Sequence, residues 1–364
     1  MAPWKRVLGS AVGAVDRAVV IAMQMRGARQ HARAEGLSHE ARLDALAQIY
    51  AAYGGDEHIH DPSVFFPTPA AIDPRLESVR RGSPARTETY DATWTSTFTP
   101  FLPEVAERYL SNVENRTARA RLYLGDASKR PAIIAIHGYM GGQWLLEEAQ
   151  WPVAWLLRRG LDVALPVLPF HAGRAGARRG APPLPSSDPR LTNEGFRQAV
   201  SDIVALARFL RARGAPHVGV MGMSLGGFTT SLLATVARGE IDFAMPMIPL
   251  ASVADFAREQ GRLGAGDQAN EQHAALERAN WIVSPLSRPL SIPKDRTLVV
   301  AAEHDRITPR AHAQRIADHF GCEMMTISGG HLVQLGRSDA FRALASMLER
   351  DGIIPPRARQ RIIK

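Results

Sequence analysis

The 364-residue sequence contains a single cysteine, Cys322, and no apolar run long enough to cross a bilayer. One cysteine cannot form a disulfide within the chain, which is typical of a protein from a reducing compartment. A membrane-spanning helix needs about 20 predominantly apolar residues in succession, so the sequence predicts none. The N-terminal stretch turns apolar after a basic start, but Asp16 and Arg17 interrupt it and no small-residue cleavage site follows. We therefore expect a cytoplasmic protein without a secretory signal.

One short stretch gathers side chains that could bind a metal. Residues 56–61 (DEHIHD) combine acidic and histidine side chains, but no partner cluster lies near them in the sequence. A polar loop explains this stretch better than a metal site, and we expect neither a metal nor a cofactor.

Positive charge exceeds negative charge, since 44 lysines and arginines against 36 acidic residues give a net charge of +8. Much of the excess falls within 26–33, 174–179 and 357–364. No nucleic-acid-binding motif accompanies these charges, so we expect no nucleic-acid partner. An arginine-rich, soluble surface is the simplest interpretation. The alternative is peripheral contact with anionic lipid through a basic N-terminal helix or the C-terminal tail.

What the sequence does contain is a serine between glycines, in the stretch Gly222-Met223-Ser224-Leu225-Gly226. Residues 217–221 have the pattern of a short buried strand, and residues 225–237 have the apolar spacing of a helix. A serine on such a strand-to-helix turn is exposed above the sheet, as in a nucleophile elbow. Glycines on either side relieve the crowding at the turn, and the helix N-terminus favours a developing anion. The pattern by itself also fits an ordinary tight turn, so its meaning depends on the other motifs.

A glycine-rich loop follows an earlier apolar strand. Residues 131–136 run directly into His137-Gly138-Tyr139-Met140-Gly141-Gly142. Acyl transfer needs two N–H donors for the tetrahedral oxyanion, one from the residue after the nucleophile and one from a loop of this kind. We assign these donors to the backbone N–H groups of Leu225 and Tyr139, with Met140 as the alternative to Tyr139.

An acid and a histidine follow two later strands. The strand at 296–302 leads to Asp305, and the strand at 323–327 leads through two glycines to His331. The acid would orient the imidazole, and the imidazole would take the proton of the Ser224 hydroxyl. Glu303 is a substitute acid, but Asp305 lies deeper in the predicted turn and ranks first.

These motifs resemble those of the α/β-hydrolase superfamily, in particular its esterase, lipase and prolyl-oligopeptidase-like branches. The resemblance covers roughly residues 87–350, and the nucleophile, acid and histidine occur in the order typical of the fold. It implies an α/β fold with a mostly parallel central sheet flanked by helices. It also implies a catalytic triad and an oxyanion hole, formed by Ser224, Asp305, His331, Tyr139 and Leu225. A serine nucleophile argues against the dehalogenase branch.

We expect a serine hydrolase that cleaves a carboxylic ester through an acyl-enzyme on Ser224. An acyltransferase on the same triad is the nearest alternative, because the fold hosts many activities. A non-catalytic binding protein on a hydrolase scaffold is the other, and the complete set of motifs argues against it. The substrate would be a small-molecule or lipid ester, whose acyl chain and leaving group the sequence leaves open, as it does the oligomeric state.

The sequence predicts three parts. Residues 1–85 are predicted to form a helical accessory segment with a proline-rich connector. Residues 86–350 are predicted to form the hydrolase domain, with a cap-like insertion at about 250–293. Residues 351–364 form a basic tail. In the first part, residues 7–33 carry an apolar stripe typical of an amphipathic helix, at Val12, Val15, Val19 and Met23. Ser38 is a suitable N-cap for a second helix at 41–53.

The apolar patterns also predict the remaining elements. Alternating residues at 87–98 and 118–124 favour antiparallel edge strands, with a short helix at 103–110 between them. A further strand is expected at 161–165, and helices at 193–213 and 310–320.

Two regions are expected to determine substrate choice. The loop 171–190 follows the carboxyl end of a strand, and its His171 and Arg174 could contact an anionic group of the substrate. The cap-like insertion contributes Trp281 among other apolar residues. His137 and Met223, next to the catalytic motifs, complete the candidate substrate-binding residues.

Overall fold

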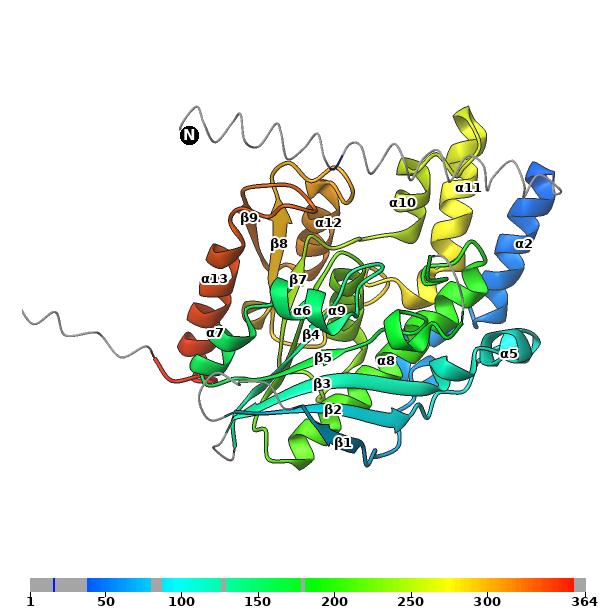
Figure 1. The fold of residues 1–364 in the computed structure, drawn as a ribbon. Helices are drawn as coiled ribbons and strands as arrows, with labels where there is room; N and C mark the ends of the chain where they lie inside the picture. Colours follow the sequence, from blue (N-terminus) through cyan, green and yellow to red (C-terminus); the bar gives the residue numbers. More distant parts are fainter. Residues whose placement is uncertain (1–15, 17–37, 80–86, 126–128, 178–180, 357–364) are drawn as a thin grey trace, which may run out of the picture.

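The computed structural model describes residues 16, 38–79, 87–125, 129–177 and 181–356. Within these ranges the chain forms a sheet of nine strands in the order β1-β2-β3-β5-β4-β6-β7-β8-β9, with helices on both faces (Figure 1). The strands are β1 (Arg75–Ser78), β2 (Thr87–Thr95), β3 (Thr117–Gly125), β4 (Ala132–Ile136), β5 (Asp162–Pro166), β6 (Val218–Met223), β7 (Phe243–Met247), β8 (Leu298–Ala302) and β9 (Glu323–Ile327).

The sheet is antiparallel at one side and parallel over the rest. β1, β2, β3 and β5 pair antiparallel in succession, and β5, β4, β6, β7, β8 and β9 pair parallel. β4, β6, β7 and β8 are buried at every position, as expected for parallel strands covered on both faces. Their carboxyl ends lie at one edge of the sheet, which is where open α/β sheets bind their ligands.

Two pairs of helices enclose the sheet. α8 (Pro189–Ala212) and α9 (Leu225–Val236) pack against one face, and α7 (Val153–Arg158) and α13 (Arg337–Arg350) against the other. The other helices are α2 (His39–Ala52), α3 (Glu57–His60), α4 (Pro62–Phe65), α5 (Pro103–Leu110), α6 (Trp144–Gln150), α10 (Val253–Glu259), α11 (Gly266–Ala279) and α12 (Arg310–Phe320).

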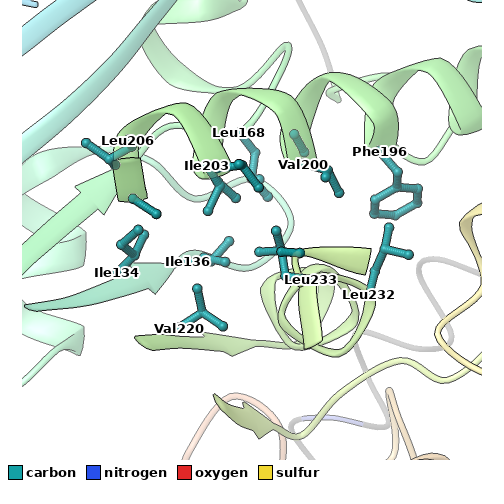
Figure 2. Close-up of a cluster of buried hydrophobic side chains, with 14 of the residues drawn as sticks. Ile134, Ile136, Leu168, Phe196, Val200, Ile203, Leu206, Val220, Leu232 and Leu233 are labelled. Atoms are coloured by element: carbon teal, nitrogen blue, oxygen red, sulfur yellow. The ribbon is translucent and has the colours of Figure 1, made fainter. Parts of the chain in front are cut away.

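The alternation of side chains along β4 divides the core between the two faces. Ile134 and Ile136 belong to the cluster under α8 and α9, and Ile133 and Ala135 belong to the cluster under α7 and α13. Figure 2 shows the first cluster, in which apolar side chains of α8, α9, β4 and β6 converge between the helices and the sheet. This packing fixes α9, and with it the turn at its N-terminus.

The N-terminal helix α2 packs against the helix α11 of the predicted cap-like insertion. Ser38 caps α2 by accepting a hydrogen bond from the Ala41 amide at 3.2 Å, as predicted. Arg42 of α2 donates to Gln272 of α11 at 3.1 Å. The two segments therefore form one helical layer (Figure 1).

The structure corrects two expectations for the N-terminal region. The region is not purely helical, because residues 75–78 pair with β2 as a short edge strand, which needs ladder hydrogen bonds on one side only. Residues 56–61 are not a loop but contribute to α3 and to the start of α4. Asp61 caps α4 by accepting a hydrogen bond from the Ser63 amide at 3.0 Å.

Other expectations agree with the structure or fall outside it. The predicted α/β class with a mostly parallel sheet is confirmed. Apart from Asp16, the predicted helix at 7–33 lies outside the described residues, as do its apolar stripe and the tail at 357–364. None of the helices within the described ranges is long and apolar enough to cross a bilayer.

Candidate active site

Ser224 occupies a strained turn between β6 and α9. Its backbone angles are φ 57° and ψ −113°, in a region that residues other than glycine rarely adopt. A Cβ atom on Gly222 would collide with the carbonyl of Gly226, and a Cβ atom on Gly226 would collide with the carbonyl of Ile136. Glycine is therefore required on both sides of the serine. Ser224 itself is half-buried, so its side chain remains accessible.

Asp305 and His331 lie against one another on neighbouring loops. The Asp305 loop (residues 303–309) follows β8, and the His331 loop (residues 328–336) follows β9. The Nδ1 atom of His331 is 2.8 Å from Oδ2 of Asp305. Because a carboxylate only accepts hydrogen bonds, Nδ1 carries the proton, and the Nε2 atom keeps the lone pair that a general base needs.

The other oxygen of Asp305 fixes the direction of the carboxylate. Oδ1 accepts hydrogen bonds from the amides of Ile307 and Thr308, each at 2.8 Å. Glu303, the substitute acid, is partly exposed, and its carboxylate lies 3.9 Å from the Nε2 atom of His304. The structure thus places Asp305, and not Glu303, beside His331.

Thr308 connects the acid–histidine pair to the serine turn. Its Oγ1 lies 3.1 Å from Oδ2 of Asp305 and 3.0 Å from Nδ1 of His331. The same hydroxyl reaches the carbonyl of Ile248 at 3.0 Å. The residue before Ile248 accepts a hydrogen bond from the Ser224 amide at 3.1 Å. Serine, acid and histidine therefore belong to one hydrogen-bonded region at the carboxyl edge of the sheet.

The Gly138 loop (residues 137–143), between β4 and α6, passes close to the serine. A Cβ atom on Gly138 would lie 3.6 Å from the Cβ of Ser224, so the backbone approaches the nucleophile as an oxyanion loop must. Met140 adopts φ 64°, which is strained for a side chain of its size. On the other side, Leu225 is the first residue of α9, where amides have no acceptor within the helix.

The two histidines predicted to bind substrate are both buried. His137 contacts the carbonyl of Gly138 through Nδ1 at 2.7 Å and accepts from the Leu168 amide through Nε2 at 3.0 Å. It therefore joins two loops and has no ring nitrogen left for a substrate. Burial lowers the pKa of His137 to about 4, so the imidazole is neutral at physiological pH.

His171 is also neutral, because burial, followed by the nearby His137, lowers its pKa to about 3. Its Nδ1 lies 2.8 Å from the carbonyl of Pro169, and its ring lies 5.9 Å from the ring of Tyr139. Its Nε2 is buried without a hydrogen-bond partner in the described part of the chain. A neutral ring cannot attract an anion by charge, which argues against the predicted anionic contact.

Arg174 does not fit the predicted contact with a substrate anion. It is 1% exposed and forms an ion pair of 2.8 Å with the buried carboxylate of Asp202. It also donates to the carbonyls of Val167 and Asn115, at 3.0 and 2.8 Å. The guanidinium group therefore holds the loop after β5 to the domain core.

We expect Arg174→Ala to lower the free energy of unfolding by about 3–5 kcal/mol, because it leaves the buried carboxylate of Asp202 without its cationic partner. Urea denaturation monitored by tryptophan fluorescence measures this change. Arg208→Ala is the matched control, since its ion pair with Glu240 is partly exposed and contributes about 1 kcal/mol or less. Equal losses in the two variants would contradict the structural role of Arg174.

The remaining two candidates for substrate binding also lie in packed surroundings. Met223 is 1% exposed, and its sulfur accepts a weak hydrogen bond from Gln150 at 3.4 Å. Trp281 follows α11 and packs, half-buried, against the apolar cluster under α12 and β8. Met223 is thus a core residue, which corrects its predicted role, whereas Trp281 keeps a partly accessible face.

No protein-family model matches the sequence. Two proteins from Mycobacterium tuberculosis, Rv2627c of strain H37Rv and MT2702 of strain CDC 1551, are each 29% identical to this chain over 336 residues. Each match covers 89% of this chain and 80% of the relative. Both relatives are described as uncharacterized.

Solved structures share the architecture. Acetyl xylan esterase 1 from Thermoanaerobacterium sp. JW/SL YS485 superimposes with a TM-score of 0.56 and 17% identity, over 80% of this chain and 93% of its own. Acetyl xylan esterase from Paenibacillus sp. R4 gives a TM-score of 0.56 and 15% identity, over the same shares of the two chains. The protein has the α/β-hydrolase fold. At this level of identity, the likeness establishes the fold and leaves the reaction to be argued from the site.

Some supporting side chains of this candidate site were not predicted from the sequence. Thr308 is one, although an aspartate followed three residues later by threonine is a recognisable turn motif. Glu147 of α6 is another, and it holds the Gly138 loop by accepting from the Gly142 amide at 2.8 Å and from Trp151 Nε1 at 3.1 Å. Burial raises the pKa of Glu147. No local sequence pattern distinguishes it from a surface glutamate.

Proposed function

We propose that the protein is a serine hydrolase that cleaves a carboxylic ester through an acyl-enzyme on Ser224. The observation that carries the proposal is the hydrogen-bonded pair of Asp305 and His331 at the sheet edge that also carries the strained serine turn. A buried carboxylate that orients a histidine, at the same sheet edge as a half-buried but accessible serine in a strained turn, is the arrangement that acyl transfer requires.

In the proposed reaction, Nε2 of His331 takes the proton of the Ser224 hydroxyl as its oxygen attacks the ester carbonyl carbon. The carbonyl oxygen becomes an oxyanion, which accepts hydrogen bonds from the amides of Leu225 and Tyr139. Collapse of this intermediate breaks the bond to the leaving alcohol, which takes the proton from His331. Water then attacks the acyl-enzyme with the same histidine as base, and releases the acid and free Ser224.

The structural neighbours support this reaction class, since both are esterases by name. Exposed apolar side chains on the two loops beside the proposed triad favour esters with an apolar group over a carbohydrate ester. The Gly138 loop and the start of α6 expose Met140, Leu145 and Leu146, and the His331 loop exposes Leu332, Val333 and Leu335. Apolar side chains exposed near a site commonly mark a binding surface.

A fluorophosphonate probe and a series of p-nitrophenyl esters test the proposal together. We expect the probe to label Ser224, which peptide mass spectrometry identifies, and the esters to be hydrolysed with a preference for acyl chains longer than acetate. Failure of the intact protein to react with the probe would favour a non-catalytic binding protein. Labelling without hydrolysis, together with acyl transfer to an added alcohol or thiol, would favour the acyltransferase alternative.

A further inference from the structure

Asp16 is fully buried, although it lies in sequence more than 200 residues before the proposed nucleophile. Its carboxylate lies against the backbone of the His331 loop. Oδ2 accepts a hydrogen bond from the His331 amide at 2.6 Å, and Oδ1 accepts one from the Leu332 amide at 3.2 Å. Hydrogen bonds from amides to a charged carboxylate are roughly twice as strong as those between neutral groups.

The same carboxylate also reaches the Asp305 loop. Oδ2 of Asp16 accepts a longer hydrogen bond of 3.4 Å from the amide of Arg306, the residue directly after the proposed catalytic acid. One side chain thus contacts the backbone of both loops that carry the acid–histidine pair. Those loops follow adjacent parallel strands, β8 and β9 (Figure 1).

Asp305 and Asp16 accept hydrogen bonds from different backbone amides of this region. Oδ1 of Asp305 accepts hydrogen bonds from the amides of Ile307 and Thr308. The carboxylate of Asp16 accepts hydrogen bonds from the amide of Arg306 and from two amides of the His331 loop. Asp305 therefore sets the direction of the imidazole ring through its side chain. Asp16 holds the backbone from which the ring projects.

We infer that Asp16 is a positioning residue of the active site, which fixes the backbone of His331 relative to Asp305. The inference rests on the proposed function, because it takes His331 as the general base. A carboxylate suits this place because both oxygens only accept hydrogen bonds. In Asp16→Asn, one acceptor becomes an NH₂ group that would face a backbone N–H, which leaves two donors opposed.

The inference gives the N-terminal segment a part in catalysis. The sequence pattern assigns residues 1–85 to an accessory segment outside the hydrolase domain. The structure places Asp16, which belongs to that segment, beside the proposed general base, so removal of residues 1–34 is expected to lower hydrolysis even of a small soluble ester. A misplacement of about 1 Å in catalytic geometry can cost about 100-fold in rate.

The test compares full-length Asp16→Asn, Asp16→Ala and Asp16→Glu with the unmodified protein on a short p-nitrophenyl ester. We expect kcat to fall about 10- to 100-fold in the Asn and Ala variants, with KM changed less than threefold, because the substrate-facing loops keep their side chains. The rate of fluorophosphonate inactivation should fall in parallel, since it depends on activation of Ser224 by His331. Asp16→Glu keeps both acceptor oxygens and should recover part of kcat.

Asp162→Asn is the matched control. Asp162 accepts a hydrogen bond from the Gly125 amide at 2.8 Å, but at the amino end of β5, away from the site. This variant should lower the thermal unfolding midpoint and leave kcat unchanged. Unchanged kcat in folded Asp16→Asn and Asp16→Ala would overturn the inference, even if their stability fell. If Asp16→Ala does not fold, the Asn and Glu variants decide the question by the same comparison.

Ser224→Ala separates this inference from the proposed function. Loss of hydrolysis in Ser224→Ala with normal kcat in Asp16→Asn overturns the role of Asp16 alone. Retained hydrolysis in folded Ser224→Ala overturns the proposed function, and the role assigned to Asp16 falls with it.

Discussion

Replacement of the serine by Ser224→Ala is expected to reduce turnover of an ester substrate by at least about 10⁴-fold, because the reaction loses its nucleophile. The fold should be retained, since alanine differs only by the lost hydroxyl and tolerates the turn as well as serine does. Steady-state hydrolysis of a p-nitrophenyl ester, together with the thermal unfolding midpoint, measures both effects.

Ser231→Ala is the control for this variant. Ser231 lies on the same helix, α9, and its hydroxyl donates to the carbonyl of Gly227 at 2.9 Å. Its replacement should change stability by about 1 kcal/mol and leave turnover intact. Substantial hydrolysis by a folded Ser224→Ala protein would show that another group is the nucleophile.

For Asp305→Asn we expect a loss of about 10⁴-fold in kcat, and the structure gives a specific reason. The amides of Ile307 and Thr308 hold one oxygen of the side chain, so the new amide nitrogen must turn toward Nδ1 of His331. A donor at that position favours the tautomer with the proton on Nε2, which can no longer act as a base. The same ester assay at a pH above 7 measures the loss.

Glu303→Gln provides the comparison for the acid. Glu303 lies on the same loop but is partly exposed, so its replacement should change kcat less than threefold and leave the unfolding midpoint near that of the unmodified protein. A larger loss in Glu303→Gln than in Asp305→Asn would transfer the role of the acid to Glu303.

The parts of the fold that could be predicted from the sequence are those whose local pattern agrees with their tertiary surroundings. The helices at 103–110 and 310–320 and the strand at 323–327 have the predicted bounds. The helix predicted at 193–213 begins earlier, at Pro189, where Asp188 provides the cap by accepting from the Arg190 amide. Helix ends depend on such caps more than on apolar spacing.

The elements that sequence reasoning missed are those stabilised by distant residues. β1 has four residues and forms only because β2 offers a free edge. α6 and α7 are short, and helices of this length depend on tertiary packing rather than on propensity. At the candidate site, strand-end motifs predicted Ser224, Asp305 and His331, and the structure places the last two in contact with each other. Glu147 and Asp16 accept hydrogen bonds from backbone amides of the Gly138 loop and the His331 loop, respectively, and such contacts leave no mark on sequence spacing.

The substrate-binding predictions assigned to a ligand polar side chains that the structure pairs within the protein. His171 and Arg174 stand in a polar loop after a strand, which resembles a binding loop in sequence. The structure instead turns Arg174 inward to Asp202 and buries His171. Sequence alone does not distinguish a polar side chain that pairs within the protein from one that binds a ligand.

The contacts of the N-terminal region also bear on the order in which the chain assembles during synthesis. Asp16 leaves the ribosome long before its partner His331, which lies 315 residues later, and α2 likewise precedes α11. At roughly 5–20 residues per second, the first segment waits about 15–60 s for the partner of Asp16 to be made. α2 meets its packing surface earlier, because α11 is complete at Ala279. The contact of Asp16 with the His331 loop therefore forms late, only after the final strand β9 and its histidine loop have been made.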